Sequence, residues 1–157
     1  MRAAWLASWA LALTACADDP GVLLGPGVDA REHELSGRDL SGLDLTGANL
    51  GAAKLRACKL EGAVLMRAHL SWADLGEAQL SGANLAWASL ERADLRHAIL
   101  HDAALEQALF TGAHLIGADF SGVRDVTALQ LSRAHCWDDT TKLPVGILLI
   151  PAVQPHE

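Results

Sequence analysis

The histidines and cysteines are the side chains of this sequence that could act in catalysis or bind a metal. His97, His101 and Asp102 lie close together in the sequence, and His135 is next to Cys136. Zinc sites and nucleophilic triads use characteristic spacings of such residues, and none of these spacings occurs here. The glycines form no phosphate-binding motif, because they recur as part of a repeat. The sequence therefore predicts solvated histidines, no metal or other cofactor, and a protein that is not an enzyme.

These residues belong to a chain dominated by a five-residue repeat, which runs without a miss from His33 to Gly122. Its 18 blocks carry Leu at every fifth position, with Phe110 and Phe120 as the two exceptions. The position two residues earlier is Ala throughout Ala48–Ala118, except for Cys58. The residue between these two is small or polar, and often Asp or Asn.

A period of five excludes the two regular secondary structures. In an α-helix a residue every fifth position advances about 500°, so the leucines would spiral around the whole surface. In a strand successive leucines would point to opposite faces. A coil that turns by 90° per block places every Leu at the axis, and only a small residue fits two positions earlier. Cys58, at such a position, is expected to be a buried and inert thiol.

Read as Ala-(Asp/Asn)-Leu-X-X, the blocks resemble the pentapeptide-repeat proteins. The resemblance implies an all-β fold, a right-handed quadrilateral β-helix, with about 4.5 coils over residues 33–122. It implies little about function, because one solenoid scaffold serves many unrelated tasks.

Two tryptophans and two arginines stand out on the surface of such a coil. Residues 20 apart stack about 4.8 Å apart along the axis, which brings Trp72 near Arg92 and Arg67 near Trp87 on two adjoining sides. All four take the last position of their block, which is mostly Gly or Ala. We expect two cation–π pairs. The rings either lie flat over the coil corner, or the four residues form the surface that binds an unidentified protein partner.

The same stacking predicts pairs of charged residues between coils. Asp39 is expected beside Lys59, Lys54 beside Asp74, and Asp94 beside His114. Exposed pairs of this kind each stabilise by a few tenths of a kcal/mol.

Residues 1–15 are interpreted as a signal peptide, with Arg2 followed by a short apolar region. The run from Leu13 to Cys16 resembles a bacterial lipobox, which implies cleavage before Cys16 and lipidation of that residue. A short helix with a chance cysteine is the alternative. Ala17 implies, by the same resemblance, an outer-membrane lipoprotein facing the periplasm, held to the membrane by its N-terminal lipid anchor.

Residues 16–32 are expected to form a lipidated tether and N-terminal cap, with Pro and Gly next to several apolar residues. The first coil is expected to be frayed, because His33 and Arg38 occupy inward positions where Ala would fit.

Residues 123–157 are expected to form a C-terminal cap, because the next repeat centre would be Asp125, which cannot be buried unpaired. Thr127 can cap a short helix that ends near Arg133, with Leu129 and Leu131 covering the last coil. The apolar run 146–153 is too short to span a bilayer and is expected to form a strand or an extended cap.

Two functions follow from these features. The first is a non-enzymatic envelope lipoprotein that acts as a rigid β-helical scaffold or protein-interaction module. The alternative is a DNA mimic, since some pentapeptide-repeat proteins form acidic rods that bind type II topoisomerases. Residues 33–122 carry seven basic and eleven acidic residues, a net charge of −4 with the two signs interspersed. This pattern and the proposed export both argue against the mimic, and we expect no nucleic-acid partner.

Overall fold

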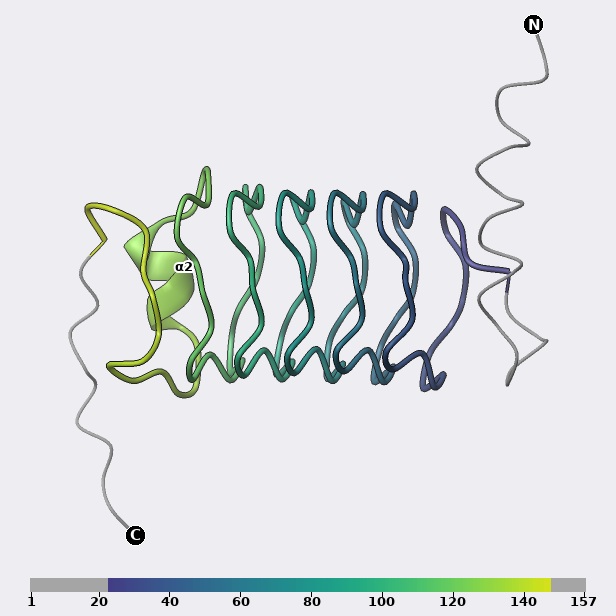
Figure 1. Cartoon of the computed structure of the whole chain (residues 1–157), viewed down its shortest axis with the longest axis horizontal. Coiled ribbons are helices and arrows are strands. Elements are labelled where there is room, and N and C mark those ends of the chain that lie inside the picture. The colour runs from purple at the N-terminus through teal and green to yellow at the C-terminus, as the bar shows by residue number, and fades with distance from the viewer. Residues whose placement is uncertain (1–22, 148–157) are drawn as a thin grey trace, which may run out of the picture.

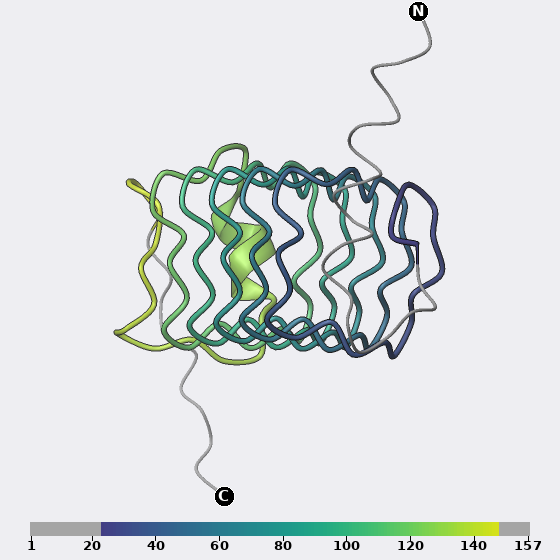
Figure 2. The same ribbon diagram turned by 45° about the vertical axis from the view of Figure 1, so that its right-hand side comes forward.

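The computed structural model describes residues 23–147, which form a single stack of square coils. Figure 1 shows the coils succeeding one another along one axis, with the helix α2 (Ala128–Ser132) at the C-terminal end. The right-handed quadrilateral β-helix expected from the repeat is confirmed. Figure 2 shows that the sides of the coils line up from one end of the stack to the other.

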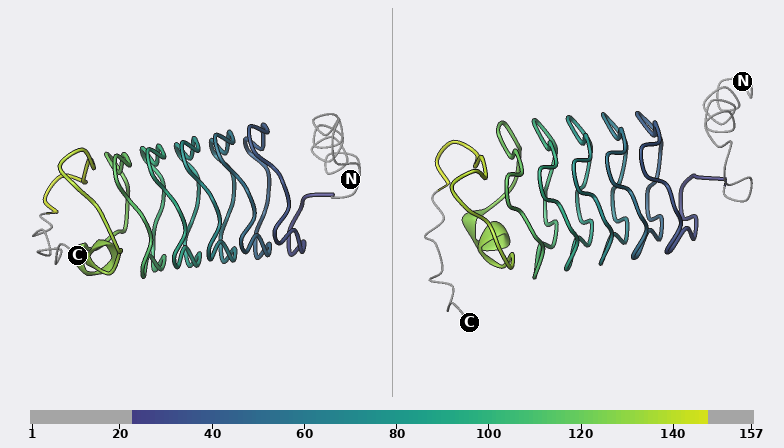
Figure 3. Two further views of the ribbon diagram at one scale, coloured as in Figure 1. Left: turned by 90° about the horizontal axis from the view of Figure 1, so that it is seen from below. Right: turned by 60° about the horizontal axis from the view of Figure 1, so that its bottom comes forward.

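The coils are joined by parallel β-bridges between residues 20 apart in the sequence, from Asp29–Asn49 to Ala104–Arg124. Each side of a coil contributes one bridge, and within residues 23–147 no longer strand forms. Backbone hydrogen bonds run in both directions from each coil: the Lys54 amide donates to His33 and the Leu55 amide to Asp74. The side views in Figure 3 show the narrow, even spacing that results.

The core is a column of leucines with alanines beside them. The repeat leucines from Leu45 onward, and both phenylalanines, are at most 1% exposed, as are the alanines two positions before them. Phe110 and Phe120 pack edge to face with ring centroids 6.0 Å apart. Cys58 is fully buried as expected, and its thiol donates to the Leu35 carbonyl at 2.8 Å. Burial raises the pKa of this thiol to about 11, which leaves it protonated and unreactive.

Each right-angle corner is a β-turn that begins at a repeat leucine. The carbonyl of Leu45 accepts from the amide of Ala48 at 3.0 Å, and the same bond recurs from block to block. The last residue of every block from Gly37 to Gly122 has a positive φ. This geometry is that of a type II turn, which favours Gly at that position.

The Asp and Asn residues before the leucines stabilise the corner that follows them. The Asp74 carboxylate accepts the amide N–H of Gly76 at 3.0 Å, two residues along. Six other residues of this kind do the same: Asp39, Asp44, Asn49, Asn84, Asp94 and Asp119. Because these side chains fold back onto their own turns, the repeat prefers Asp and Asn for a local reason.

The residues of the expected charge pairs stack as predicted. Lys59 and His114 are among the groups that lower the pKa of Asp39 and of Asp94, but the expected Lys54–Asp74 ion pair is wrong. Lys54 pairs with Glu34 at 3.2 Å instead of with Asp74, and Asp94 pairs with Arg96. The carboxylates of Asp74 and Asp94 accept hydrogen bonds from the amides of their own turns. Lys54 and Asp94 therefore form their ion pairs with Glu34 and Arg96.

The first coil is regular, so the expected fraying is wrong. The bridge ladder begins at Asp29, one block before residue 33, and Ala30 takes the inward position of a leucine with no exposed surface. Leu24 is 7% exposed and packs against the core. His33 and Arg38 are half-buried in the inward positions, where the end of the stack leaves room for them.

The helix α2 closes the C-terminal end in the place of a further coil. Thr127 caps it as expected: the Thr127 hydroxyl accepts the Gln130 amide N–H at 3.2 Å, and the Gln130 side chain accepts the Thr127 amide N–H at 2.8 Å. The Gln130 side-chain amide donates to the carbonyls of Leu105 and Ala108. In earlier coils the carbonyl at the position of Ala108 accepts an amide of the next coil, as Ala88 does from Leu109. Leu131 is fully buried, but Leu129 is 63% exposed. The two leucines lie about 200° apart around the helix, so they cannot both face the core.

After α2 the chain returns to the coil pattern, with bridges from His114 to Cys136 and from Asp119 to Lys142. Lys142 pairs with Asp119 at 2.8 Å. Burial raises the pKa of Asp119, but Lys142 and the hydrogen bonds from Ser121 outweigh it and lower that pKa to about 2.

The expected signal peptide (1–15), the lipidation site at Cys16 and most of the apolar run 146–153 lie outside the described residues. Among the residues that the structure describes, no helix has the length and apolar character needed to cross a bilayer.

We expect Leu75→Ala to lower the free energy of unfolding by about 2–5 kcal/mol, because the leucine is fully buried between coils that cannot collapse into the cavity. Leu129→Ala is the matched control and should change stability by less than about 0.5 kcal/mol. Urea unfolding monitored by circular dichroism measures both. Similar losses for the two variants would contradict the assignment of the core.

We expect the Lys142–Asp119 pair to stabilise the C-terminal end at neutral pH and to fail in acid. The folded pKa of Asp119 lies below its ordinary value, so its contribution is complete above about pH 5 and is lost as the pH falls towards 2. Asp119→Asn should therefore show a smaller loss of stability than wild type across this pH range in urea unfolding. An identical acid dependence in both proteins would contradict this prediction.

Candidate interaction face

The four residues singled out by the sequence border one side of the β-helix. Arg67 and Trp72 stand at the two corners of the side formed by residues 68–70, and Trp87 and Arg92 stand at the corners of residues 88–90 in the next coil. His69 and Ser89 form a bridge between these two sides, and Ser89 forms the next bridge with Leu109. We call this surface the tryptophan face: Arg67, His69, Trp72, Trp87, Ser89, Arg92 and Leu109.

The corners place these large side chains on strained backbone. The φ angles are 58° at Arg67, 65° at Trp72, 62° at Trp87 and 57° at Arg92. A left-handed conformation costs a residue with a side chain roughly 1–2 kcal/mol relative to the right-handed one. The corner would accept Gly at lower cost, so the turn itself does not account for a tryptophan.

One of the two expected cation–π pairs is present. The Arg92 guanidinium lies over the Trp72 ring, 4.7 Å from its centroid. The Arg67–Trp87 pair is not found in the described part of the chain, although the two residues stack as expected. Trp72 is 61% exposed and Trp87 is 54% exposed, so each ring keeps more than half of its surface open to solvent.

Three of the exposed large apolar side chains of the described residues belong to this face. Among residues 23–147 seven large apolar side chains are exposed. Trp72, Trp87 and Leu109 belong to the face, and a fourth, Leu129, lies on α2, which takes the place of the next coil on this side. Ile99 lies on the opposite side.

The charges around the face cancel. Arg67 and Arg92 stand at its corners beside Glu91 and Glu106, which are the other charged turn residues there. The net charge of −4 on residues 33–122 is therefore carried by the other three sides.

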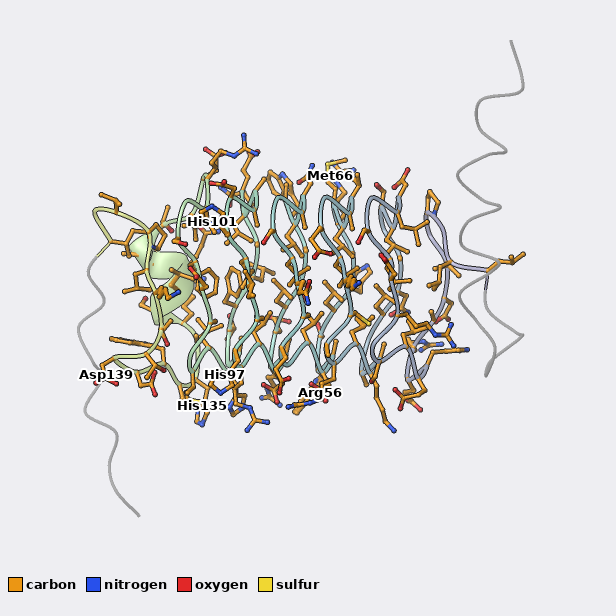
Figure 4. The ribbon with its side chains drawn as sticks, in the orientation of Figure 1. Arg56, Met66, His97, His101, His135 and Asp139 are labelled. Atoms are coloured by element: carbon orange, nitrogen blue, oxygen red, sulfur yellow. The ribbon has the colours of Figure 1, made fainter. Side chains whose placement is uncertain are left out.

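The candidate catalytic histidines do not converge. His101 contacts the Ser121 hydroxyl at 3.0 Å and the Asp102 carboxylate at 3.1 Å, all at one corner. His97 lies at the opposite edge of the view in Figure 4, with its ring against Gly117. In the described range 23–147 no three His, Cys, Asp or Glu side chains are placed to hold a metal.

The Cys136 thiol lies 3.0 Å from Nδ1 of His114, a contact that the sequence analysis missed. The two residues are 22 apart rather than 20, because α2 interrupts the repeat. The His114 and His135 rings also meet edge to face, with centroids 5.2 Å apart. Burial raises the pKa of Cys136, which favours the neutral thiol over a nucleophilic thiolate.

An open depression of about 490 Å³ lies at the first coil, lined by Asp29, Arg31, Glu32 and His33. The Asp29 carboxylate is held by the Arg31 guanidinium at 3.0 Å. This pair fills the polar part of the depression and leaves no set of groups suited to catalysis.

The repeat pattern agrees with a known family. Eight copies of the family model for pentapeptide repeats match the chain, within residues 28–124. The chain belongs to the pentapeptide-repeat family. No match was found among curated proteins.

Solved structures of pentapeptide-repeat proteins are similar to this one. A pentapeptide-repeat protein from the thylakoid lumen of Arabidopsis thaliana is 33% identical, with a TM-score of 0.65, over 69% of this chain and 77% of the other. A trypsin-treated form of QnrB1, a plasmid-mediated fluoroquinolone resistance protein, is 18% identical, with a TM-score of 0.56, over 73% of this chain and 64% of the other. The likeness to QnrB1 shows the fold alone.

We expect the tryptophans of the face to be dispensable for folding. In the double variant Trp72→Gly, Trp87→Gly, loss of the cation–π pair costs about 0.5–1 kcal/mol, and the greater freedom of the unfolded chain costs a similar amount per glycine. Relief of the positive φ offsets these losses. The free energy of unfolding should stay within about 1 kcal/mol of wild type in urea titrations. A loss above about 3 kcal/mol, typical of a core aromatic, would show that the rings belong to the fold.

Proposed function

We propose that this pentapeptide-repeat protein is a non-enzymatic lipoprotein of the bacterial envelope. In this proposal Cys16 carries the lipid that anchors the chain in the outer membrane, and the β-helix is a rigid scaffold on the periplasmic side. The scaffold acts by binding, and the tryptophan face is its binding surface.

The tryptophan face is the observation that supports a binding role most directly. Trp72 and Trp87 are both more than half exposed on strained corners that glycine would fit better. Large exposed apolar patches on a soluble fold are typical of interaction sites. The scattered histidines and the neutral Cys136 thiol offer no comparable support for a catalytic role.

The envelope location rests on the sequence around Cys16 and has support from a relative. The similar Arabidopsis protein comes from the thylakoid lumen, which is also a compartment bounded by membrane and outside the cytosol.

The distribution of charge argues against the alternative, a DNA mimic that binds a type II topoisomerase. A mimic needs rows of free anions, whereas here Glu34, Glu77 and Asp94 are paired with Lys54, Arg56 and Arg96 in turn. Five coils at about 4.8 Å each make a rod of only about 24 Å. Likeness to QnrB1 at 18% identity adds no support for the shared activity.

We expect Cys16→Ala to abolish incorporation of labelled palmitate and to remove the protein from the outer-membrane fraction. Cys136→Ala is the matched control and should keep both the label and the fractionation, because its thiol lies against His114 in the folded domain. Mass spectrometry of the N-terminal peptide from the wild type should show an acylated Cys16. Failure of the wild-type protein to incorporate labelled palmitate would refute the proposed anchor.

A further inference from the structure

We propose that the tryptophan face lies against the lipid surface in which the chain is anchored. This inference rests on the proposed lipid anchor, and it names the partner of the binding surface as a phospholipid headgroup layer. The length of the tether, the side chains of the face and the distribution of charge support this contact.

The length of the tether limits how far the β-helix can lie from the proposed lipid anchor. Six residues separate Cys16 from Leu23, and the core begins at Leu24. The seven Cα–Cα steps from Cys16 to Leu23 span at most about 25 Å when the chain is fully extended. The first coil is thus held close to the membrane, and a rod anchored at one end can lie along the surface.

The tryptophan face has the side chains suited to a membrane interface. Tryptophan favours the headgroup level, because its ring is large and apolar and its indole N–H still reaches polar partners. Trp72 and Trp87 project from the two opposite edges of a flat side, so both reach a plane laid against that side. Leu109 lies on the same side one coil further along and is 45% exposed. Arg67 and Arg92 stand beside the tryptophans, where guanidinium groups can bond lipid phosphates.

The distribution of charge favours this side of the β-helix over the other three for contact with the lipid surface. The face is neutral, while the remaining sides carry the net charge of −4 of residues 33–122. An anionic headgroup layer repels those three sides and does not repel the tryptophan face.

A flat surface fits this face better than a protein partner does. Protein hot spots concentrate in packed pockets at the centre of an interface. Here the aromatic rings stand at two opposite corners, and the side between them carries His69, Ser89 and Leu109, with the Ser71 and Ser89 hydroxyls bonded to each other at 2.9 Å.

Tryptophan quenching by brominated lipids tests the contact. The acylated mature protein is reconstituted into vesicles of phosphatidylethanolamine and phosphatidylglycerol with brominated acyl chains. Trp137→Phe removes the third tryptophan of the mature chain, so that the emission reports Trp72 and Trp87. We expect loss of this emission relative to vesicles of unbrominated lipid.

The matched control moves the reporter to the opposite side. A variant with Trp72→Phe, Trp87→Phe, Trp137→Phe and Ile99→Trp carries one tryptophan at a position that is already 42% exposed. It should keep its emission in brominated vesicles, provided that circular dichroism shows the native fold. Equal quenching of both proteins would overturn the inference, because it would show no preferred side.

The outcomes separate this inference from the proposed function. If the wild type does not float with the vesicles, the anchor itself fails and the inference fails with it. If it floats but Trp72 and Trp87 keep their emission, the anchor stands and the lipid contact is overturned. Capture of an envelope protein that depends on Trp72 and Trp87, without quenching, would assign the face to a protein partner instead.

Discussion

The whole structure depends on the turn that follows each inward leucine. Its leucine carbonyl accepts the amide three residues on, and its second central residue has a positive φ in every block from residue 37 to residue 122. The turn changes the chain direction by a right angle, so four blocks return the chain above its start. Stacking then satisfies the remaining amides between coils, such as that of Leu55 with the Asp74 carbonyl. The strain at each corner is therefore repaid by hydrogen bonds that no single block could form.

The sequence predicted the core because the core has a strict period. Leu and Ala at fixed positions of a five-residue block allow one regular path, and the structure follows it. The N-terminal start was harder to predict, since the block 28–32 has Ala30 instead of a leucine at its centre although its backbone is regular. Leu129 was misplaced for a simpler reason: the capping signal of Thr127 was recognised, but the direction of each residue around α2 was not considered.

Side-chain partners were predicted less well than the backbone. Stacking at intervals of 20 residues was correct. The carboxylates of Asp74 and Asp94, however, accept hydrogen bonds from the amides of their own turns rather than from a lysine or a histidine of a neighbouring coil. A local hydrogen bond two residues away costs less conformational entropy than an ion pair between two long side chains. The Cys136–His114 contact depends on how many residues α2 adds to the coil, which the repeat pattern does not encode.

The tryptophan face was recognisable in the sequence because Trp72 and Trp87 break the preference for Gly and Ala at the corners. The position of its residues on the coil was not, since the Trp72–Arg92 corner and the Arg67–Trp87 corner border the same side of the coil and not two adjoining sides. The structure also explains why such residues are tolerated there. The corner amides of Trp72 and Arg92 keep their bonds to the next coil, at 3.0 and 2.9 Å, whatever the side chain is. Side chains at this position point away from the leucine column, so a corner can acquire a binding residue without altering the core. The β-helix thus separates the residues that fold the chain from those that can give it a partner.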